Sequence, residues 1–375
     1  MTRIPEANYI ADPDGDLLIL LGPTTPPISQ TGESTLHERN STWDYDSRVL
    51  VSSKRMSLAS PVFKIMLEGS FKESLELKTL GRLTLPLPED DPVAMRILID
   101  VIHGHSKYIP KVVHIHAFAR FAILADYYQC SAVAEACVNL WKQKIVELSL
   151  WKRSETRLAC WIFITWVFNL SVEFKDATAR IVKGLPYGLG EILARNQLEL
   201  PIPTTVIRKV DEYRQAALKG FKKILVVALS RFRGGRILYD VGRRMIFIPD
   251  LTHARVMAYD DAKACDDEEA CYDAKACDAE IIEYFTKALS KHSLFPLPQG
   301  PEDYKGWVFD ELIGRVWSVK VNGGSNVGIR GHQQKVLDIT LARIKFSIDH
   351  LYSKTFGVDV ASLKAHFNVR GAARA

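Results

Sequence analysis

The feature that most constrains this chain is a pair of dipeptides, Ser60-Pro61 and Asp91-Pro92, each followed by a periodic apolar stretch. Serine and aspartate side chains accept hydrogen bonds from the free amides at a helix start, and proline loses no hydrogen bond at the first helical position. Each dipeptide therefore predicts the start of a helix. Gly69 and Gly104 predict the ends of these two helices, because glycine is the usual residue where a helix closes.

Short apolar runs alternate with these helices. Residues 16–21, 48–52 and 83–87 predict three short strands. Residues 23–45, rich in Pro, Thr, Ser and Gly, predict a long loop. Two further helices are expected, the second capped by Ser131; their apolar positions are Phe118, Phe121, Ala122 and Ala125, then Val133, Cys137, Leu140 and Trp141. Residues 14–147 therefore predict an α+β domain, a small sheet covered by helices.

Residues 148–375 predict a second, mainly α-helical domain. Its apolar residues recur at intervals of three and four in three stretches: Leu158, Trp161, Ile162, Thr165 and Trp166; Ile207, Val210, Ala217, Phe221, Ile224 and Ala228; and Leu337, Leu341, Ile344, Ile348 and Leu351. Leu200-Pro201-Ile202-Pro203-Thr204 predicts a break and a cap before the second stretch, and Arg214 interrupts its stripe. We expect these helices to pair inside the domain, because neither long stripe covers enough heptads for a coiled-coil dimer. Residues 231–280 predict an irregular, charged segment.

Composition limits the partners. A chain of 375 residues with 47% hydrophobic and 25% charged residues suits two globular domains, and a net charge of +5 does not indicate nucleic acid or membrane. No apolar run is long enough to span a bilayer, and residues 1–6 lack the apolar core of a secretory signal. The six cysteines are then expected as reduced thiols of an intracellular protein, in the cytoplasm or the nucleus.

Several segments, in this order, resemble the BTB/POZ domain as it occurs in filamentous fungi. They are Val51-Ser52-Ser53-Lys54, residues 57–63, residues 85–92, Ile102-His103-Gly104 and residues 124–130. The second half more loosely resembles the helical extension that follows this domain in many fungal proteins. One departure is the stretch of residues 23–45, where the family usually joins its first two strands tightly.

The resemblance implies a non-enzymatic protein–protein interaction or scaffold protein that needs no cofactor. It would act by self-association, as a homodimer along the first helix and edge strand, or by recruiting a partner. Adaptors of cullin-based ubiquitin ligases in this family carry a hydrophobic-x-Glu motif after the Ser-Pro-Val-Phe helix, and Phe71-Lys72-Glu73 occupies that place. Phe71 would enter an apolar pocket and Glu73 would pair with a basic partner. The alternative is a surface loop with Phe71 packed on its own domain. The sequence shows no pattern of the kelch propeller or MATH domain that usually forms the second half of such adaptors.

Two groups of residues raise the question of a metal site. His103, His105, His114 and His116 cluster in the sequence, but positions two apart on a helix point in different directions. His103 precedes the helix-ending Gly104, where a partial positive charge suits the helix dipole. Cys265, Cys271 and Cys277 are evenly spaced within a near-repeat and lack the close pairs that zinc sites favour. We therefore expect no metal site.

The segment 219–244 is the remaining candidate for binding. It holds eight basic residues against Asp240 and includes Arg231-Phe232-Arg233. This pattern fits either a nucleic-acid patch, as in a nuclear DNA-associated regulator, or a solvated helix end. Without a zinc finger or helix-turn-helix signature, nucleic acid is the less favoured reading. The glycine-rich residues 323–328 lack a P-loop pattern and predict a loop, and no motif indicates an enzyme.

Overall fold

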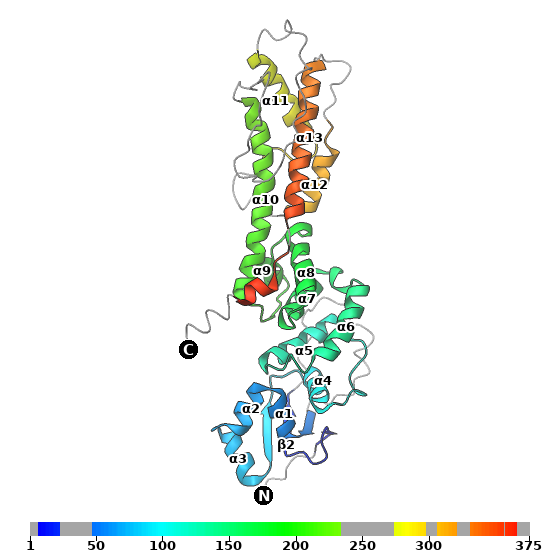
Figure 1. The fold of residues 1–375 in the computed structure, drawn as a ribbon, viewed down its shortest axis with the longest axis vertical. Coiled ribbons are helices and arrows are strands. Elements are labelled where there is room, and N and C mark those ends of the chain that lie inside the picture. Colours follow the sequence, from blue (N-terminus) through cyan, green and yellow to red (C-terminus); the bar gives the residue numbers. More distant parts are fainter. Residues whose placement is uncertain are drawn as a thin grey trace. The chain divides into compact units, whose positions relative to one another are not determined.

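The computed structural model describes residues 7–22, 47–233, 274–297, 306–320, 331–355 and 357–365. The chain divides into two compact units (Figure 1). Unit 1 comprises Met1–Val182, Tyr187–Tyr213 and Phe356–Ala375, and unit 2 comprises Lys183–Pro186 and Arg214–Thr355. The boundaries between these units differ from the expected single boundary between residues 147 and 148. The physical reason is that α7 (Glu155–Val167) packs on α5 (Ile115–Tyr127), which carries one core across that position.

Unit 1 contains a small sheet of four strands in the order β1-β3-β2-β4. The strands are β1 (Tyr9–Ile10), β2 (Leu17–Leu21), β3 (Ser47–Val51) and β4 (Leu83–Leu87). β2 pairs antiparallel with β3 and parallel with β4, with Ile19 opposite Val49 and Leu85. The three predicted strands are confirmed. β1 was missed, because two residues are too few to show an alternating pattern.

Helices form most of the rest of the described part of unit 1. They are α1 (Ser53–Ala59), α2 (Pro61–Glu68), α3 (Lys72–Leu80), α4 (Pro92–His103), α5, α6 (Glu135–Glu147), the 3₁₀ turn η2 (Leu150–Lys152), α7, α8 (Ser171–Gly184), α9 (Leu189–Arg195) and the start of α10 (Thr204–Arg233). α1 packs on α2, α2 on α3, and α3 on β4, so these three helices gather beside the sheet (Figure 1). The mixed α/β architecture, a small sheet with many helices, is as predicted.

The predicted helix starts are confirmed with their caps. Ser60 Oγ accepts a hydrogen bond from Phe63 N at 3.1 Å, and Asp91 Oδ1 accepts one from Ala94 N at 2.8 Å. Gly104 closes α4 with φ +76°, the left-handed conformation that favours glycine. Gly69 closes α2 with φ −74°, and here the reason for glycine is space, because a Cβ would collide with Ile65 O.

The helices of unit 1 differ from the prediction in three respects. Ser131 is not the cap of α6, which begins at Glu135 after an irregular turn. Leu140 is 44% exposed, and Val133 is 41% exposed and lies before α6, whereas Cys137 and Trp141 are buried as expected. Two helices, α1 and α3, were not predicted at all. Both are short and carry apolar residues on more than one side, so no single stripe marks them.

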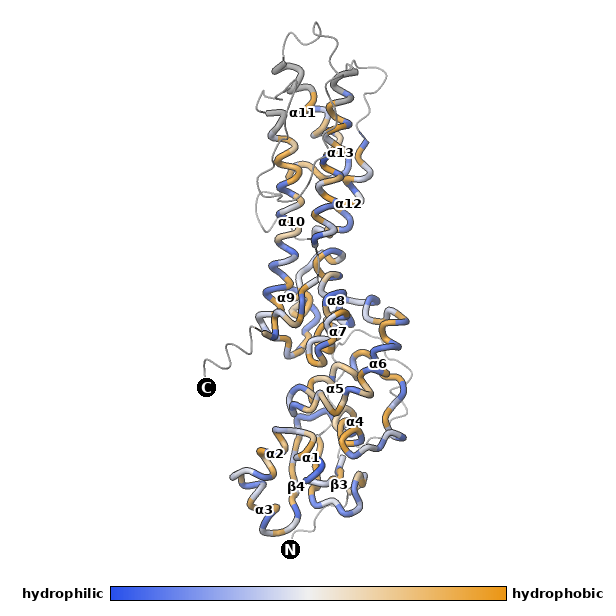
Figure 2. The backbone as a smooth tube through the Cα atoms, viewed as in Figure 1, coloured by the Kyte–Doolittle hydropathy of each residue, from blue (hydrophilic) through white to orange (hydrophobic). Residues whose placement is uncertain are grey.

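The core of unit 1 is built around α7, whose apolar side chains are buried on every face. Figure 2 shows apolar residues recurring along α4, α5 and α7. The Trp141 ring packs edge-on against Phe118 and Phe121 at 5.1 Å between ring centroids, and its Nε1 donates to Pro110 O at 2.7 Å. The aromatic stripe of residues 158–166 is therefore structural, as predicted.

Unit 2 is helical, with most of α10 and all of α11 (Ala274–Lys291), α12 (Phe309–Ser318) and α13 (Gly331–Lys354). α11 and α12 pack on α13, and the Phe221 ring of α10 lies edge-on to Phe309 of α12, so the stripes of α10 and α13 face helices of the same chain, as predicted. Arg214 interrupts the α10 stripe because it is buried and donates to Leu185 O, Pro186 O and Trp307 O at 3.3, 2.7 and 2.6 Å. Within the expected irregular segment 231–280, both ends prove helical, and residues 234–273 lie outside the described chain.

Candidate functional site

Tyr128, at the end of α5, contacts residues at the start of α2 and in the turn before α4. Its backbone oxygen accepts a hydrogen bond from Ser60 Oγ at 2.5 Å, and its ring stacks on Phe63 with 4.4 Å between centroids. Its hydroxyl donates to Asp90 Oδ2 at 2.5 Å. Burial raises the pKa of both Tyr128 and Asp90, and the hydrogen bond from Tyr128 opposes the rise at Asp90. The start of α2, the turn before α4 and the end of α5 therefore meet at one buried side chain.

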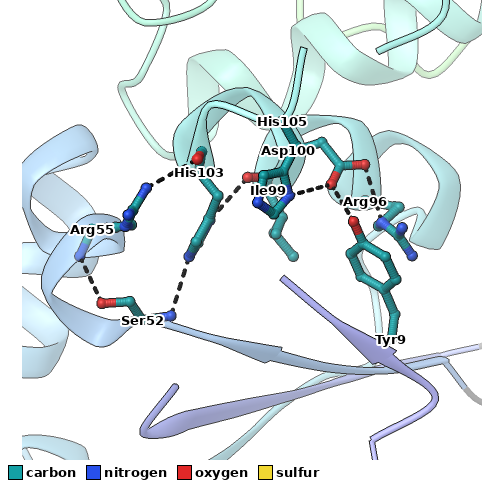
Figure 3. A network of polar contacts seen from close by, with 8 residues as sticks. All are labelled: Tyr9, Ser52, Arg55, Arg96, Ile99, Asp100, His103 and His105. Atoms are coloured by element: carbon teal, nitrogen blue, oxygen red, sulfur yellow. Dashed lines mark hydrogen bonds and ion pairs between the residues drawn. The ribbon is translucent and has the colours of Figure 1, made fainter. Parts of the chain in front are cut away.

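A second set of contacts, which we call the polar clamp, surrounds Asp100 on α4 and consists of Tyr9, Arg96, Asp100 and His105 (Figure 3). Asp100 Oδ1 accepts from Tyr9 Oη at 2.7 Å, Oδ2 accepts from Arg96 Nε at 3.1 Å, and His105 Nδ1 lies 3.3 Å from Oδ1. The Arg96 guanidinium also stacks on the Tyr9 ring. Burial, followed by the bond to Asp100, raises the pKa of Tyr9 to about 12. The polar clamp thus fastens the edge strand β1 to the C-terminal half of α4.

His103 lies next to the polar clamp and is only 4% exposed (Figure 3). Its Nε2 receives a hydrogen bond from Ser52 N at 3.1 Å, and its Nδ1 lies 3.0 Å from Ile99 O. Nε2 must therefore carry a lone pair and Nδ1 the proton, which is the neutral ring. Burial lowers the pKa of this imidazole, with the Arg55 cation acting in the same direction. The expected partial positive charge at the helix end is thus wrong, because the ring is buried and has to accept the Ser52 amide.

Helices α1 to α3 carry large apolar side chains that do not enter the core. We call this set the apolar face: Leu58 is 80% exposed, Ile65 60%, Phe71 54%, Leu75 59% and Leu80 67%. The opposite sides of the same helices supply Met56, Phe63 and Leu67 to the core. Single exposed apolar residues are normal on a protein surface. These five residues lie on or next to three consecutive helices, of which α1 packs on α2 and α2 on α3, and their side chains are available to a partner.

The structure places Phe71 and Glu73 at the start of α3 and not in a loop. Phe71 is the N-cap residue and its side chain is more than half exposed, so it is not packed into its own domain. Glu73 lies in the first helical turn and is half-buried. The other members of the apolar face were missed from the sequence. A signal for them exists, since Leu75, Leu77 and Leu80 are more leucines than one face of so short a helix can bury.

The four clustered histidines have different contacts, although His103 and His105 are neighbours. His114 is the N-cap residue of α5, and His116 Nδ1 lies 3.6 Å from Cys160 Sγ on α7. Burial raises the pKa of the Cys160 thiol to about 12, so this cysteine stays protonated and unreactive at neutral pH. In the described parts of the chain, no group of three or more His, Cys, Asp or Glu residues could hold a metal ion. Of the repeat cysteines, Cys265 and Cys271 lie outside the described residues and Cys277 falls in α11.

The basic segment 219–244 is described only as far as Arg233, where α10 ends; residues 234–244 and the glycine-rich residues 323–328 lie outside the described chain. On α10, Lys219 and Lys223 are exposed. Two cations on one helix do not distinguish a nucleic-acid patch from a solvated surface.

Among the described helices, none combines the length and the apolar character that crossing a membrane requires. Comparison of the chain with protein-family models, with curated proteins and with solved structures finds no match.

Proposed function

We propose that this chain is a non-enzymatic protein-interaction protein that docks its partner on the apolar face of a BTB/POZ-like domain. The observation that carries the proposal is the exposure of five large apolar side chains on α1 to α3. Protein interfaces take most of their binding energy from a few anchor residues, often aromatic ones, and Phe71 is the aromatic residue of this set.

The internal contacts of unit 1 support the same conclusion. The Tyr128 contacts connect the starts of α2 and α4 to the end of α5, and the polar clamp connects β1 to α4, through buried or partly buried hydrogen bonds. A rigid support of this kind lowers the entropy that a docking surface loses when it binds. The polar side chains in these contacts bind one another and the backbone, which is a structural use of their chemistry.

Self-association is the first form of docking to test, because it needs no second protein. We expect the full-length protein to show a concentration-dependent mass by sedimentation or light scattering, and Phe71→Ala and Leu75→Ala to shift it toward the monomer. Val172→Ala is the matched control, since Val172 is 69% exposed on α8, outside the apolar face. A monomer at tens of micromolar in every variant rules out self-association and leaves recruitment of another protein.

Recruitment of a cullin scaffold, as a substrate adaptor of a ubiquitin ligase, is the second candidate. The specific observation is the exposed Phe71 at the N-cap of α3 with Glu73 in the first turn. We expect purified cullin to bind the full-length protein, Phe71→Ala to weaken binding at least tenfold, or about 1.4 kcal/mol, and Glu73→Lys to weaken it further. Equal binding by the wild type and both variants, or no binding at all, contradicts this candidate.

A further inference from the structure

We propose that His103 is an acid-sensitive latch that holds the start of α1, and thereby regulates the apolar face. The idea rests on the proposed function for its consequence, but the latch itself is a property of the fold. His103 lies at the C-terminal end of α4, while Ser52, whose amide it binds, lies between β3 and α1 (Figure 3). One hydrogen bond to an imidazole lone pair therefore connects two elements far apart in the sequence.

Protonation of His103 removes the acceptor. The imidazolium has two N–H groups and no lone pair, so Nε2 and the Ser52 amide would face each other as two donors. Ser52 is also the N-cap residue of α1, and its hydroxyl accepts the Arg55 amide at 3.5 Å. The lost hydrogen bond is therefore that of the N-cap residue of α1.

The charges around the ring oppose the protonated form. Arg55 Nη1 on α1 donates a hydrogen bond to His103 O at 2.9 Å. His105 lies in the turn after α4, with 6.0 Å between its ring centroid and that of His103. Among the groups acting on this imidazole, Asp12, between β1 and β2, favours the cation, and it lies 3.7 Å from Arg55 Nε. Within the described residues, β3 and α5 add no charged group to those acting on this imidazole. The closed latch therefore accepts a proton less readily than an imidazole in water does.

The sign of the pH dependence follows from this geometry. The pKa of His103 is lowered in the closed form and returns to about 6.5 when the ring reaches water. The latch is then stable above about pH 6.5 and weakens as the pH falls below that value. For a closed form that stays unprotonated, the open population rises about tenfold between pH 7.5 and pH 5.5.

Opening affects the apolar face through α1. This helix carries Leu58, the most exposed member of the set, and packs directly on α2, which carries Ile65. A partner that binds the ordered arrangement of α1 and α2 loses affinity when α1 loosens. We therefore expect docking to weaken in mild acid.

Hydrogen exchange on the full-length protein tests the latch without a partner. After correction for intrinsic rates, amides of residues 52–58 should exchange faster at pH 5.5 than at pH 7.5, by up to about tenfold. His103→Gln, whose amide oxygen can accept the Ser52 amide at any pH, should abolish this difference. His105→Gln, which changes the neighbouring imidazole, should keep it.

No pH effect in the wild type, an equal effect in His103→Gln, or an increase spread evenly over unit 1 would overturn the latch. The wild-type measurement stays decisive if His103→Gln does not fold. Self-association or cullin binding measured at the same two pH values separates the two proposals. A local exchange response without a change in binding overturns the apolar face as the docking site and leaves the latch in place.

Discussion

Replacing Asp100 with Asn tests whether the polar clamp stabilises unit 1. The Asp100 side chain is 3% exposed and its ion-pair partner Arg96 is 10% exposed, so the pair is almost fully removed from water. In Asp100→Asn the guanidinium stays buried without its counter-charge, while Tyr9 and His105 keep a weaker, neutral acceptor. Breaking a buried pair from one side costs about 3–5 kcal/mol, so we expect the free energy of unfolding to fall by that amount.

A double-mutant cycle distinguishes this cost from a general loss of packing. Arg96→Met with Asp100→Asn removes both charges, and an apolar stem remains where the guanidinium stacked on Tyr9. The double variant should therefore lose less unfolding free energy than the two single variants lose together, by at least about 1 kcal/mol. Asp14→Asn is the matched control, because Asp14 is exposed and should change stability by no more than about 0.5 kcal/mol.

Urea unfolding followed by tryptophan fluorescence measures these differences at pH 7. A loss below about 1 kcal/mol in Asp100→Asn, or strict additivity in the double variant, would refute the reasoning. Either result would mean that water reaches Asp100 and that β1 is not fastened by it.

Three further substitutions probe other buried contacts. Tyr128→Phe removes the donor to Asp90; we expect a loss of about 1–3 kcal/mol at pH 7 that shrinks as the pH falls through the raised pKa of Asp90, measured by urea unfolding at several pH values. Arg214→Met leaves three carbonyls without their donor and should destabilise unit 2 by about 3 kcal/mol, measured by hydrogen exchange in α12 and α13. Gly357→Ala places a Cβ against Lys175 O and should detach residues 357–365, measured as faster proteolysis at the C-terminus.

Each of these has a control in the same chain. Phe63→Leu keeps the Tyr128 hydroxyl, so its loss of stability should not depend on pH between 4 and 7. Lys219→Ala on the exposed side of α10 should leave unit 2 within about 0.5 kcal/mol of the wild type. Gly314→Ala meets open space in the middle of α12 and should be neutral or stabilising, by up to about 1 kcal/mol. Equal effects of a test variant and its control contradict the corresponding contact.

Local chemistry explains which elements were predictable. Ser60-Pro61, Asp91-Pro92 and Gly104 each act on the few backbone groups next to them, and all three behave as expected. β2 and β4 are apolar runs of sufficient length between clear breaks. The prediction of Ser131 as a cap was wrong, because the same residue type also occurs in turns and only the fold selects between the two uses.

Long-range contacts explain what the sequence did not indicate. β1 exists because Tyr9 reaches Asp100 on α4, a contact across 91 residues that no local pattern contains. His103 looks like a cation at a helix end until the Ser52 amide, 51 residues away, requires its lone pair. Phe71 was recognised as a candidate from its place in the chain, but its exposure depends on which face of α3 the neighbouring helix and strand cover.

The sequence by itself determined the boundaries of α2 and α4, most of the apolar stripes and the mixed α/β class, since these depend on residues that are neighbours along the chain. Only the tertiary structure decided which polar groups are buried with partners and which apolar groups are left on the surface. The physical reason is that hydrogen-bond pairing and solvent exposure depend on residues brought together by folding. Arg214 shows this most directly, because its three carbonyl partners come from two segments distant from α10.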